Sequence, residues 1–193
     1  MPYLETISLP LLAYLLGSLS SAIILSTIMG FPDPRSEGSN NPGATNVLRI
    51  AGKKAAFLTL VGDCLKGLIP VLVAMTVSDD RLLIAATGFC AFAGHCYPVF
   101  FRFKGGKGVA TAIAVNVGFN WIIGLIIIAI WLLFAKFFKI SSLAAIIAFA
   151  TLPLLIYWQE TSMPITLIST AMSVILIWRH RSNIQRLLQG TES

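Results

Sequence analysis

Residues 108–135 read GVATAIAVNVGFNWIIGLIIIAIWLLFA and contain no charged side chain. As one straight helix this stretch would be about 40 Å long, which exceeds the roughly 30 Å hydrocarbon core of a bilayer. Three residues that favour a turn interrupt its middle: Gly118, Asn120 and Gly124. We therefore expect two short helices that meet there.

The composition places the whole chain in a membrane. Hydrophobic residues make up 56% of its 193 residues, only 11% are charged, and the mean hydropathy is +0.84, which excludes an ordinary soluble globule. Uncharged runs, several long enough to cross a bilayer, cover residues 6–32, 82–101, 108–135, 140–159 and 161–178. The first run lacks a basic segment before it, so we expect it to remain as a span. Short alternating segments typical of a barrel are absent, which predicts an all-α integral membrane protein.

The basic residues indicate the topology. Of the 14 Lys and Arg residues, 12 lie in four clusters, at residues 35–54, 102–107, 136–139 and 179–186. The positive-inside rule places these clusters in the cytoplasm. A single span over residues 108–135 would carry Lys136 and Lys139 to the opposite side, whereas two short helices return the chain to the cytoplasm.

The charge pattern therefore predicts a seven-transmembrane-helix bundle with the N-terminus outside and the C-terminus cytoplasmic. The expected helices cover residues 7–30, 55–77, 82–101, 108–119, 120–138, 140–158 and 162–178. A tilted six-span arrangement is the alternative, although it breaks the charge rule. Residues 1–193 would form a single transmembrane domain.

Two cytoplasmic loops carry groups that suit a phosphate. The first loop combines turn-forming glycines with hydroxyl and amide side chains, and Arg49 adds a forked cation. It reads Gly38-Ser39-Asn40-Asn41-Pro42-Gly43-Ala44-Thr45-Asn46. Lys104-Gly105-Gly106-Lys107-Gly108 places glycine amides between lysines at the start of a helix. The P-loop spacing G-x-x-x-x-G-K-[ST] is missing, which argues against nucleotide hydrolysis. An ordinary polar turn and a basic anchoring loop are the alternatives.

Further polar residues lie within apolar surroundings. Asp63 and Lys66 have the i, i+3 spacing of an ion pair, which we expect chiefly to neutralise itself and lock neighbouring helices. His95 fits a packing role as well as a ligand role. In the tail, His180 and Asn183 share one helical face, which an interfacial amphipathic helix alone leaves unexplained.

The missing motifs narrow the chemistry. The cysteines, Cys64, Cys90 and Cys96, lack metal-ligand spacing, and no H-E-x-x-H motif is present, so we expect no metal and no cofactor. The H-x-x-x-x-D pair of common glycerolipid acyltransferases is also missing. Acyl transfer would then favour a good leaving group or a base supplied by the substrate.

Taken in order, the motifs resemble the PlsY family of bacterial acyl-phosphate:glycerol-3-phosphate acyltransferases over about residues 8–192. They are GSNNPGATN at 38–46, Asp63-x-x-Lys66-Gly67, Gly94-His95 through Lys104-Gly-Gly-Lys107-Gly-Val-Ala-Thr111, and His180-x-x-Asn183-Ile-x-Arg186 followed by Gly190-x-Glu192. Two departures are Asn40, where many relatives have glycine, and Ala144-Ala145, where the family often has serines after Ser142.

The resemblance implies transfer of a fatty acyl group from a long-chain acyl phosphate to the sn-1 hydroxyl of glycerol 3-phosphate. The products would be lysophosphatidic acid and inorganic phosphate, in the first step of phospholipid synthesis and without acyl-CoA. The enzyme would lie in the bacterial inner membrane with its active site facing the cytoplasm. The expected partners are these substrates, the bilayer and a soluble enzyme that makes the acyl phosphate, and no nucleic acid.

Site residues follow by the same resemblance. Substrate binding would involve Ser39, Asn41, Gly43, Thr45, Asn46, Arg49, Lys104, Gly105, Gly106, Lys107, Ser142, His180 and Asn183. The catalytic residues among them would be His180, Asn183 and Ser39. Supporting roles would fall to Asp63, Lys66, His95 and Arg186.

Two other classes of protein compete with this interpretation. A small transporter of an organic phosphate would also place charge within the membrane, but the chain has no internal repeat and its polar groups gather on one face. A purely structural membrane subunit would leave the glycine-rich loops without a reason.

Overall fold

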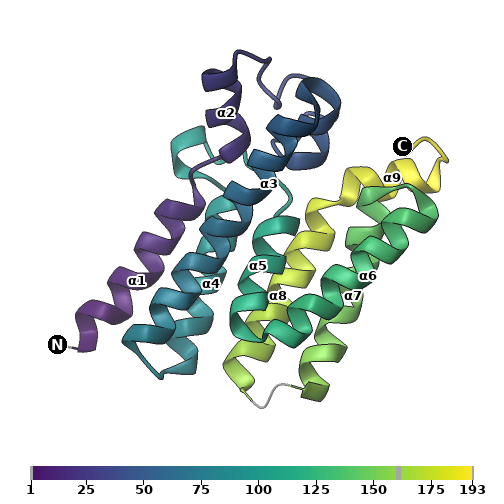
Figure 1. Cartoon of the computed structure of the whole chain (residues 1–193). Coiled ribbons are helices and arrows are strands. Elements are labelled where there is room, and N and C mark those ends of the chain that lie inside the picture. The colour runs from purple at the N-terminus through teal and green to yellow at the C-terminus, as the bar shows by residue number, and fades with distance from the viewer. Residues whose placement is uncertain (1, 160–161, 193) are drawn as a thin grey trace. The chain divides into compact units, whose positions relative to one another are not determined.

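The computed structural model describes residues 2–159 and 162–192, with side chains from residue 6 onward, and α-helix dominates these ranges (Figure 1). No strand occurs within them, so the predicted all-α class is confirmed. Among the described residues, four helical segments are long and apolar enough to cross a bilayer: Ala44–Val77, Arg81–Phe101, Trp121–Phe138 and Ser141–Gln159. Two bent helix pairs raise the number to six if each forms one span.

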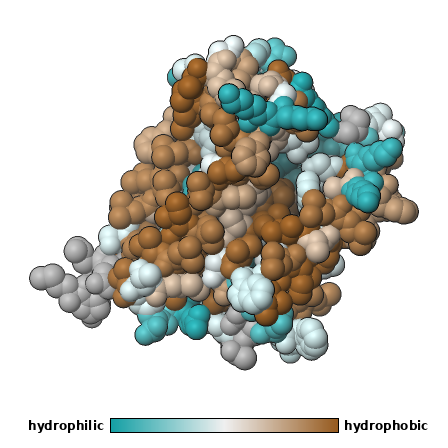
Figure 2. Space-filling model, in the orientation of Figure 1, coloured by the Kyte–Doolittle hydropathy of each residue, from teal (hydrophilic) through white to brown (hydrophobic). Residues whose placement is uncertain are grey.

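The surface has the distribution expected of a chain in a bilayer. In the view of Figure 2, hydrophobic side chains cover the flanks of the helices and hydrophilic ones gather near the helix ends. Large aromatic side chains are exposed near several helix ends, among them Trp121, Tyr157, Trp158 and Trp178. Tryptophan and tyrosine favour the boundary between hydrocarbon and headgroups.

The chain divides into two compact units, one up to Val115 and one from Asn116 onward. Unit 1 contains α1 (Pro2–Gly17), α2 (Ser21–Met29), α3 (Ala44–Val77), α4 (Arg81–Cys96), the short 3-10 helix η1 (Val99–Phe101) and the first part of α5 (Val109–Phe119). Helix α4 packs against α1 and α3, and α2 packs against α3. Helices α1 and α4 approach closely at Gly94, where a Cβ atom would collide with the Tyr14 carbonyl oxygen.

The first predicted helix, residues 7–30, is broken in the structure. Helices α1 and α2 meet at a 41° bend after Gly17. The bend frees backbone groups that find partners elsewhere in unit 1, because the Leu19 carbonyl oxygen accepts a hydrogen bond from Lys66 Nζ at 2.9 Å. Buried polar groups need such partners, and here a distant side chain replaces a backbone bond.

Two other predicted boundaries also differ. Helix α3 begins at Ala44 rather than near residue 55, and its early turns are joined to the rest through a kink at Gly52, whose φ of +81° suits glycine. Helix α4 ends at Cys96 rather than near residue 101, because Pro98 follows and cannot donate to a continuing helix.

Unit 2 contains the end of α5 followed by α6 (Trp121–Phe138), α7 (Ser141–Gln159), α8 (Met163–Arg179) and α9 (Arg181–Leu188). The predicted break near Asn120 is confirmed, because α5 ends at Phe119 and the Asn120 side chain caps α6 by accepting from the Ile122 and Ile123 amides. Helix α7 packs against both α6 and α8. The tail forms α9, which joins α8 at a 54° bend.

Candidate functional site

The loop before α3 is held in shape by the buried side chain of Asn46, which is 1% exposed. Its amide nitrogen donates to the Pro34 and Glu37 carbonyl oxygens at 2.9 and 3.0 Å. Its carbonyl oxygen accepts from the Ser39 amide at 2.8 Å. Gly38 has a φ of +60°, and a Cβ atom there would collide with the Asn46 side chain. Asn46 is therefore committed to the backbone of the loop itself.

The other predicted residues of this loop lie nearer the surface. Ser39, Thr45 and Arg49 are exposed, whereas Asn41 and Gly43 are half-buried. Gly43 occupies the N-cap position of α3. Residues with hydroxyl, amide and guanidinium groups thus lie in the loop before this helix and in its first turns, and the start of a helix favours a bound anion through its N–H groups and dipole.

The glycines of the second loop are required by its close approach to the end of α4. The Gly106 amide donates to the His95 carbonyl oxygen at 3.1 Å. A Cβ atom on Gly105 would collide with that same carbonyl oxygen, and one on Gly106 would collide with His95 Nε2. Both glycines are buried, whereas Lys104 is exposed and Lys107 is half-buried. The predicted anion-binding loop therefore lies directly on His95.

The predicted ion pair is confirmed, and it belongs to a larger buried cluster. Lys66 Nζ lies 2.9 Å from Asp63 Oδ1, and both side chains are almost fully buried. The same carboxylate oxygen accepts from Ser21 Oγ at 3.0 Å and lies 3.6 Å from His95 Nδ1. Thr111 Oγ1 donates to the Asp63 backbone oxygen at 2.9 Å. The cluster thus joins α3 to the start of α2, to α4 and to α5.

A second, partly buried cluster forms in unit 2 around Glu192. Its carboxylate accepts from Ser142 Oγ at 2.6 Å, from Asn183 Nδ2 at 2.5 Å and from Arg186 Nε at 2.6 Å. Sequence reasoning assigned no role to Glu192, although it named the three residues that Glu192 brings together. The available signal was Gly190-x-Glu192 itself, because the φ of +67° at Gly190 turns the chain back toward α9.

His180 lies at the junction of α8 and α9 and is 2% exposed. Its Nδ1 is 2.8 Å from the Leu176 carbonyl oxygen. Because a carbonyl oxygen can only accept, Nδ1 must carry the proton, and Nε2 of the neutral ring is then an acceptor. This hydrogen bond fixes both the tautomer and the orientation of the ring.

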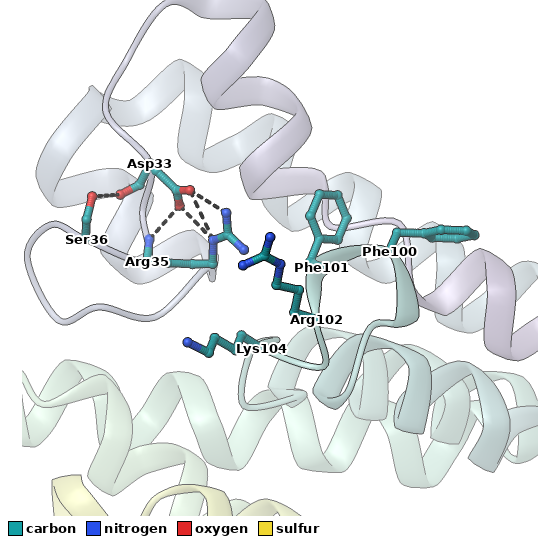
Figure 3. Close-up of a pocket in the computed structure, with 7 residues that line it drawn as sticks. All are labelled: Asp33, Arg35, Ser36, Phe100, Phe101, Arg102 and Lys104. Carbon is teal, nitrogen blue, oxygen red and sulfur yellow. Dashed lines mark hydrogen bonds and ion pairs between the residues drawn. The ribbon is translucent and has the colours of Figure 1, made fainter.

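The structure brings together some predicted residues in each unit. In unit 1, Asp63, Lys66 and His95 meet in the buried cluster. A cleft nearby in the same unit is lined by Lys104 and by residues that the sequence did not single out as site residues, including Arg35 (Figure 3). In unit 2, Ser142, Asn183 and Arg186 meet at Glu192. The convergence of these two groups on one cytoplasmic site stays a prediction.

Comparisons with known proteins identify the chain as an integral membrane acyltransferase. The family model described as glycerol-3-phosphate acyltransferase matches residues 7–190. The chain is 53% identical over 181 residues to the glycerol-3-phosphate acyltransferase of Methylococcus capsulatus, covering 94% of this chain and 91% of the relative. It is also 53% identical over 181 residues to that of Hydrogenovibrio crunogenus, covering 93% and 87%.

Solved structures agree with the sequence relatives. The glycerol 3-phosphate form of PlsY, an integral membrane glycerol 3-phosphate acyltransferase, matches with a TM-score of 0.94 and 38% identity, covering 97% of this chain and 94% of that one. Its lysophosphatidic acid form matches with a TM-score of 0.89 and 37% identity over the same shares. The chain belongs to the PlsY family of glycerol-3-phosphate acyltransferases.

The buried cluster of unit 1 predicts an asymmetric response to mutation. Lys66→Met should lower the free energy of unfolding by about 3–5 kcal/mol, because it leaves the Asp63 carboxylate buried without its main countercharge. Replacing both residues, Asp63→Leu with Lys66→Met, should cost clearly less. Unfolding in mixed micelles titrated with a denaturing detergent measures both. A double variant as unstable as the single one would contradict this account.

The Glu192 cluster predicts a pH dependence. Partial burial acts to raise the pKa of Glu192, but the hydrogen bonds from Ser142, Asn183 and Arg186 and the Arg186 charge outweigh it, so the pKa lies below its ordinary value of 4.5. The stabilisation is therefore fully present above that value and is lost as the pH falls through the lower, folded-state pKa.

Glu192→Gln should consequently lose less thermal stability than the unmodified chain between pH 6 and pH 3, because glutamine has no charge to lose in this range. The unfolding midpoint in detergent, followed across this range, measures the effect. Glu37→Gln removes an exposed glutamate and should keep the original slope. Equal slopes for all three proteins would show that Glu192 does not contribute.

Proposed function

We propose that this enzyme transfers a fatty acyl group from a long-chain acyl phosphate to the sn-1 hydroxyl of glycerol 3-phosphate, releasing inorganic phosphate. The observation that carries the proposal is the likeness, over nearly the whole chain, to a PlsY structure in glycerol 3-phosphate and lysophosphatidic acid forms. The exposed lysine and arginine of the two unit 1 loops support it, because both substrates carry phosphate. Phospholipid synthesis follows from the family.

The proposed setting is a single catalytic domain of seven spans in the bacterial inner membrane, with the N-terminus outside and the site facing the cytoplasm. The short helix α5 and the break at Asn120 support this topology, because together they let residues 109–138 return to the side where they began. A soluble enzyme that makes the acyl phosphate is the proposed partner, since its product would reach the proposed site from the cytoplasm.

The proposed site residues divide by role. Side chains and backbone amides of the two unit 1 loops would hold the phosphates. The side chains are those of Ser39, Asn41, Thr45, Arg49, Lys104 and Lys107, and the amides are those of Gly43, Gly105 and Gly106. Ser142, His180 and Asn183 would contact the acyl-phosphate end. Five further residues would act by shaping the loops and the tail: Asn46, Asp63, Lys66, His95 and Arg186. The burial of the first four and the contact of Arg186 with Glu192 support this role.

The proposed reaction is a direct displacement. The hydroxyl oxygen of glycerol 3-phosphate attacks the acyl carbonyl carbon, the bond from that carbon to the phosphate oxygen breaks, and the hydroxyl proton passes to a phosphate oxygen. Cations and loop amides stabilise the charge that develops on the carbonyl oxygen and the leaving phosphate. His180, held with Nδ1 protonated, would offer Nε2 toward the reacting groups without forming a covalent intermediate.

The donor distinguishes this proposal from its alternatives. Purified protein supplied with labelled glycerol 3-phosphate should form lysophosphatidate from palmitoyl phosphate and none from palmitoyl-CoA. Product from the CoA ester alone would keep an acyltransferase and overturn the donor. No product from either donor, with the protein folded, would favour a transporter of an organic phosphate.

Loss of the His180 ring should disable turnover. His180→Ala should reduce kcat by about a hundredfold or more, the usual cost of removing a group that stabilises developing charge. Arg181→Ala is the matched control, because it removes the neighbouring exposed side chain that stacks on Trp178 and should leave kcat nearly unchanged. Near-normal turnover by His180→Ala would remove His180 from the catalytic residues.

A further inference from the structure

A cleft of about 550 Å³ lies in unit 1 beside the proposed substrate loops and is lined by three cations: Arg35, Arg102 and Lys104. Figure 3 shows the Arg102 guanidinium reaching toward that of Arg35, with Lys104 extending into the same opening. Arg35 and Arg102 are not among the residues proposed to bind the substrates, whereas Lys104 is. The cleft therefore contains charge that the reaction does not account for.

One carboxylate in the cleft neutralises only one of these cations. Asp33 accepts from Arg35 Nε at 3.1 Å and from Arg35 Nη2 at 2.6 Å, and it also accepts from the Arg35 amide at 2.9 Å. These hydrogen bonds hold the pKa of Asp33 below its usual range, so Asp33 is ionised near neutral pH. Arg35 also lies over the Phe101 ring, 5.9 Å from its centre. Arg35 is thus fixed, and the cleft retains two uncompensated positive charges.

The backbone supports this arrangement of cations. Arg102 and Phe103 both have left-handed backbone angles, with φ of +56° and +59°. Such angles are unfavourable for residues other than glycine, and they persist where the surroundings hold them. Within the described residues, neither the Arg102 nor the Lys104 side chain has an ion-pair partner. An anion bound in the cleft would offset the charges of Arg102 and Lys104.

The surroundings of the cleft indicate where the anion comes from. Phe100 and Phe103 flank these cations and are 55% and 58% exposed. They follow closely on the end of the membrane helix α4, where aromatic side chains mark the boundary between hydrocarbon and headgroups. Guanidinium forks match phosphate oxygens in geometry. We propose that this cleft binds the phosphate headgroup of an anionic membrane lipid through Arg102, at the edge of the acyl-transfer site, with which it shares Lys104.

Binding of a lipid can be measured without turnover, so the result is independent of the proposed reaction. Native mass spectrometry of the full chain, released from a neutral detergent, would compare phosphatidylglycerol with phosphatidylcholine of the same acyl chains. Phosphatidylglycerol should bind more tightly. Arg102→Gln should weaken that binding about tenfold, which corresponds to the loss of one charge-assisted hydrogen bond. Lys53→Gln, which removes an exposed lysine outside the cleft, should leave it unchanged.

Arg102→Lys keeps the charge and should give an intermediate affinity, and an unchanged thermal unfolding midpoint would show that each variant is folded. Equal binding of the two lipids would overturn the proposal. An equal loss of affinity in Lys53→Gln would also overturn it, because general surface charge would then be responsible. If inorganic phosphate binds with the same Arg102 dependence and phosphatidylglycerol does not, the ligand is a soluble phosphate and the lipid assignment is wrong.

Discussion

The ion pair between Asp63 and Lys66 is the interaction on which the arrangement of unit 1 depends. Hydrocarbon offers no water to solvate a charge, so each polar atom of the pair must find a partner within the protein. Lys66 finds the carbonyl oxygen of Leu19, which the bend between α1 and α2 leaves available. Asp63 finds Ser21 and lies beside His95. The requirements of two side chains thus hold the bend, α4 and the loop that lies on His95 in one arrangement.

The two candidate loops use their polar residues in different ways. In the first loop, Asn46 is buried and its side-chain amide donates hydrogen bonds to loop carbonyl oxygens, whereas Ser39 and Arg49 are exposed. In the second loop, the buried glycines allow the backbone to lie against α4, whereas Lys104 is exposed. A loop proposed to bind phosphate in this way therefore contains two groups of residues. One group gives the loop its shape, and the other is placed by that shape to meet a ligand.

Features that arise from neighbouring residues could be predicted from the sequence. The break at Asn120 follows from the length of an uncharged run and from a side chain that caps the next helix. The pairing of Asp63 with Lys66 follows from their spacing on one helix. Features that depend on distant contacts could not be predicted. The bend after Gly17 depends on Lys66, and the role of Glu192 depends on Ser142, fifty positions away along the chain. The residues around the bend give no sign of Lys66, and the residues of the tail give no sign of Ser142.

The spacing of Asp63 and Lys66 also bears on how the chain enters the membrane. Helices are inserted in the order in which they are synthesised, so α3 reaches the bilayer before His95 and Thr111 exist. If the two charges lay on separate helices, the first would remain unpaired in the membrane until the second helix was inserted. Because these two lie one turn apart on α3, they can neutralise each other within that single helix as it leaves the translocon. The later helices can then add their contacts to a pair that α3 forms by itself.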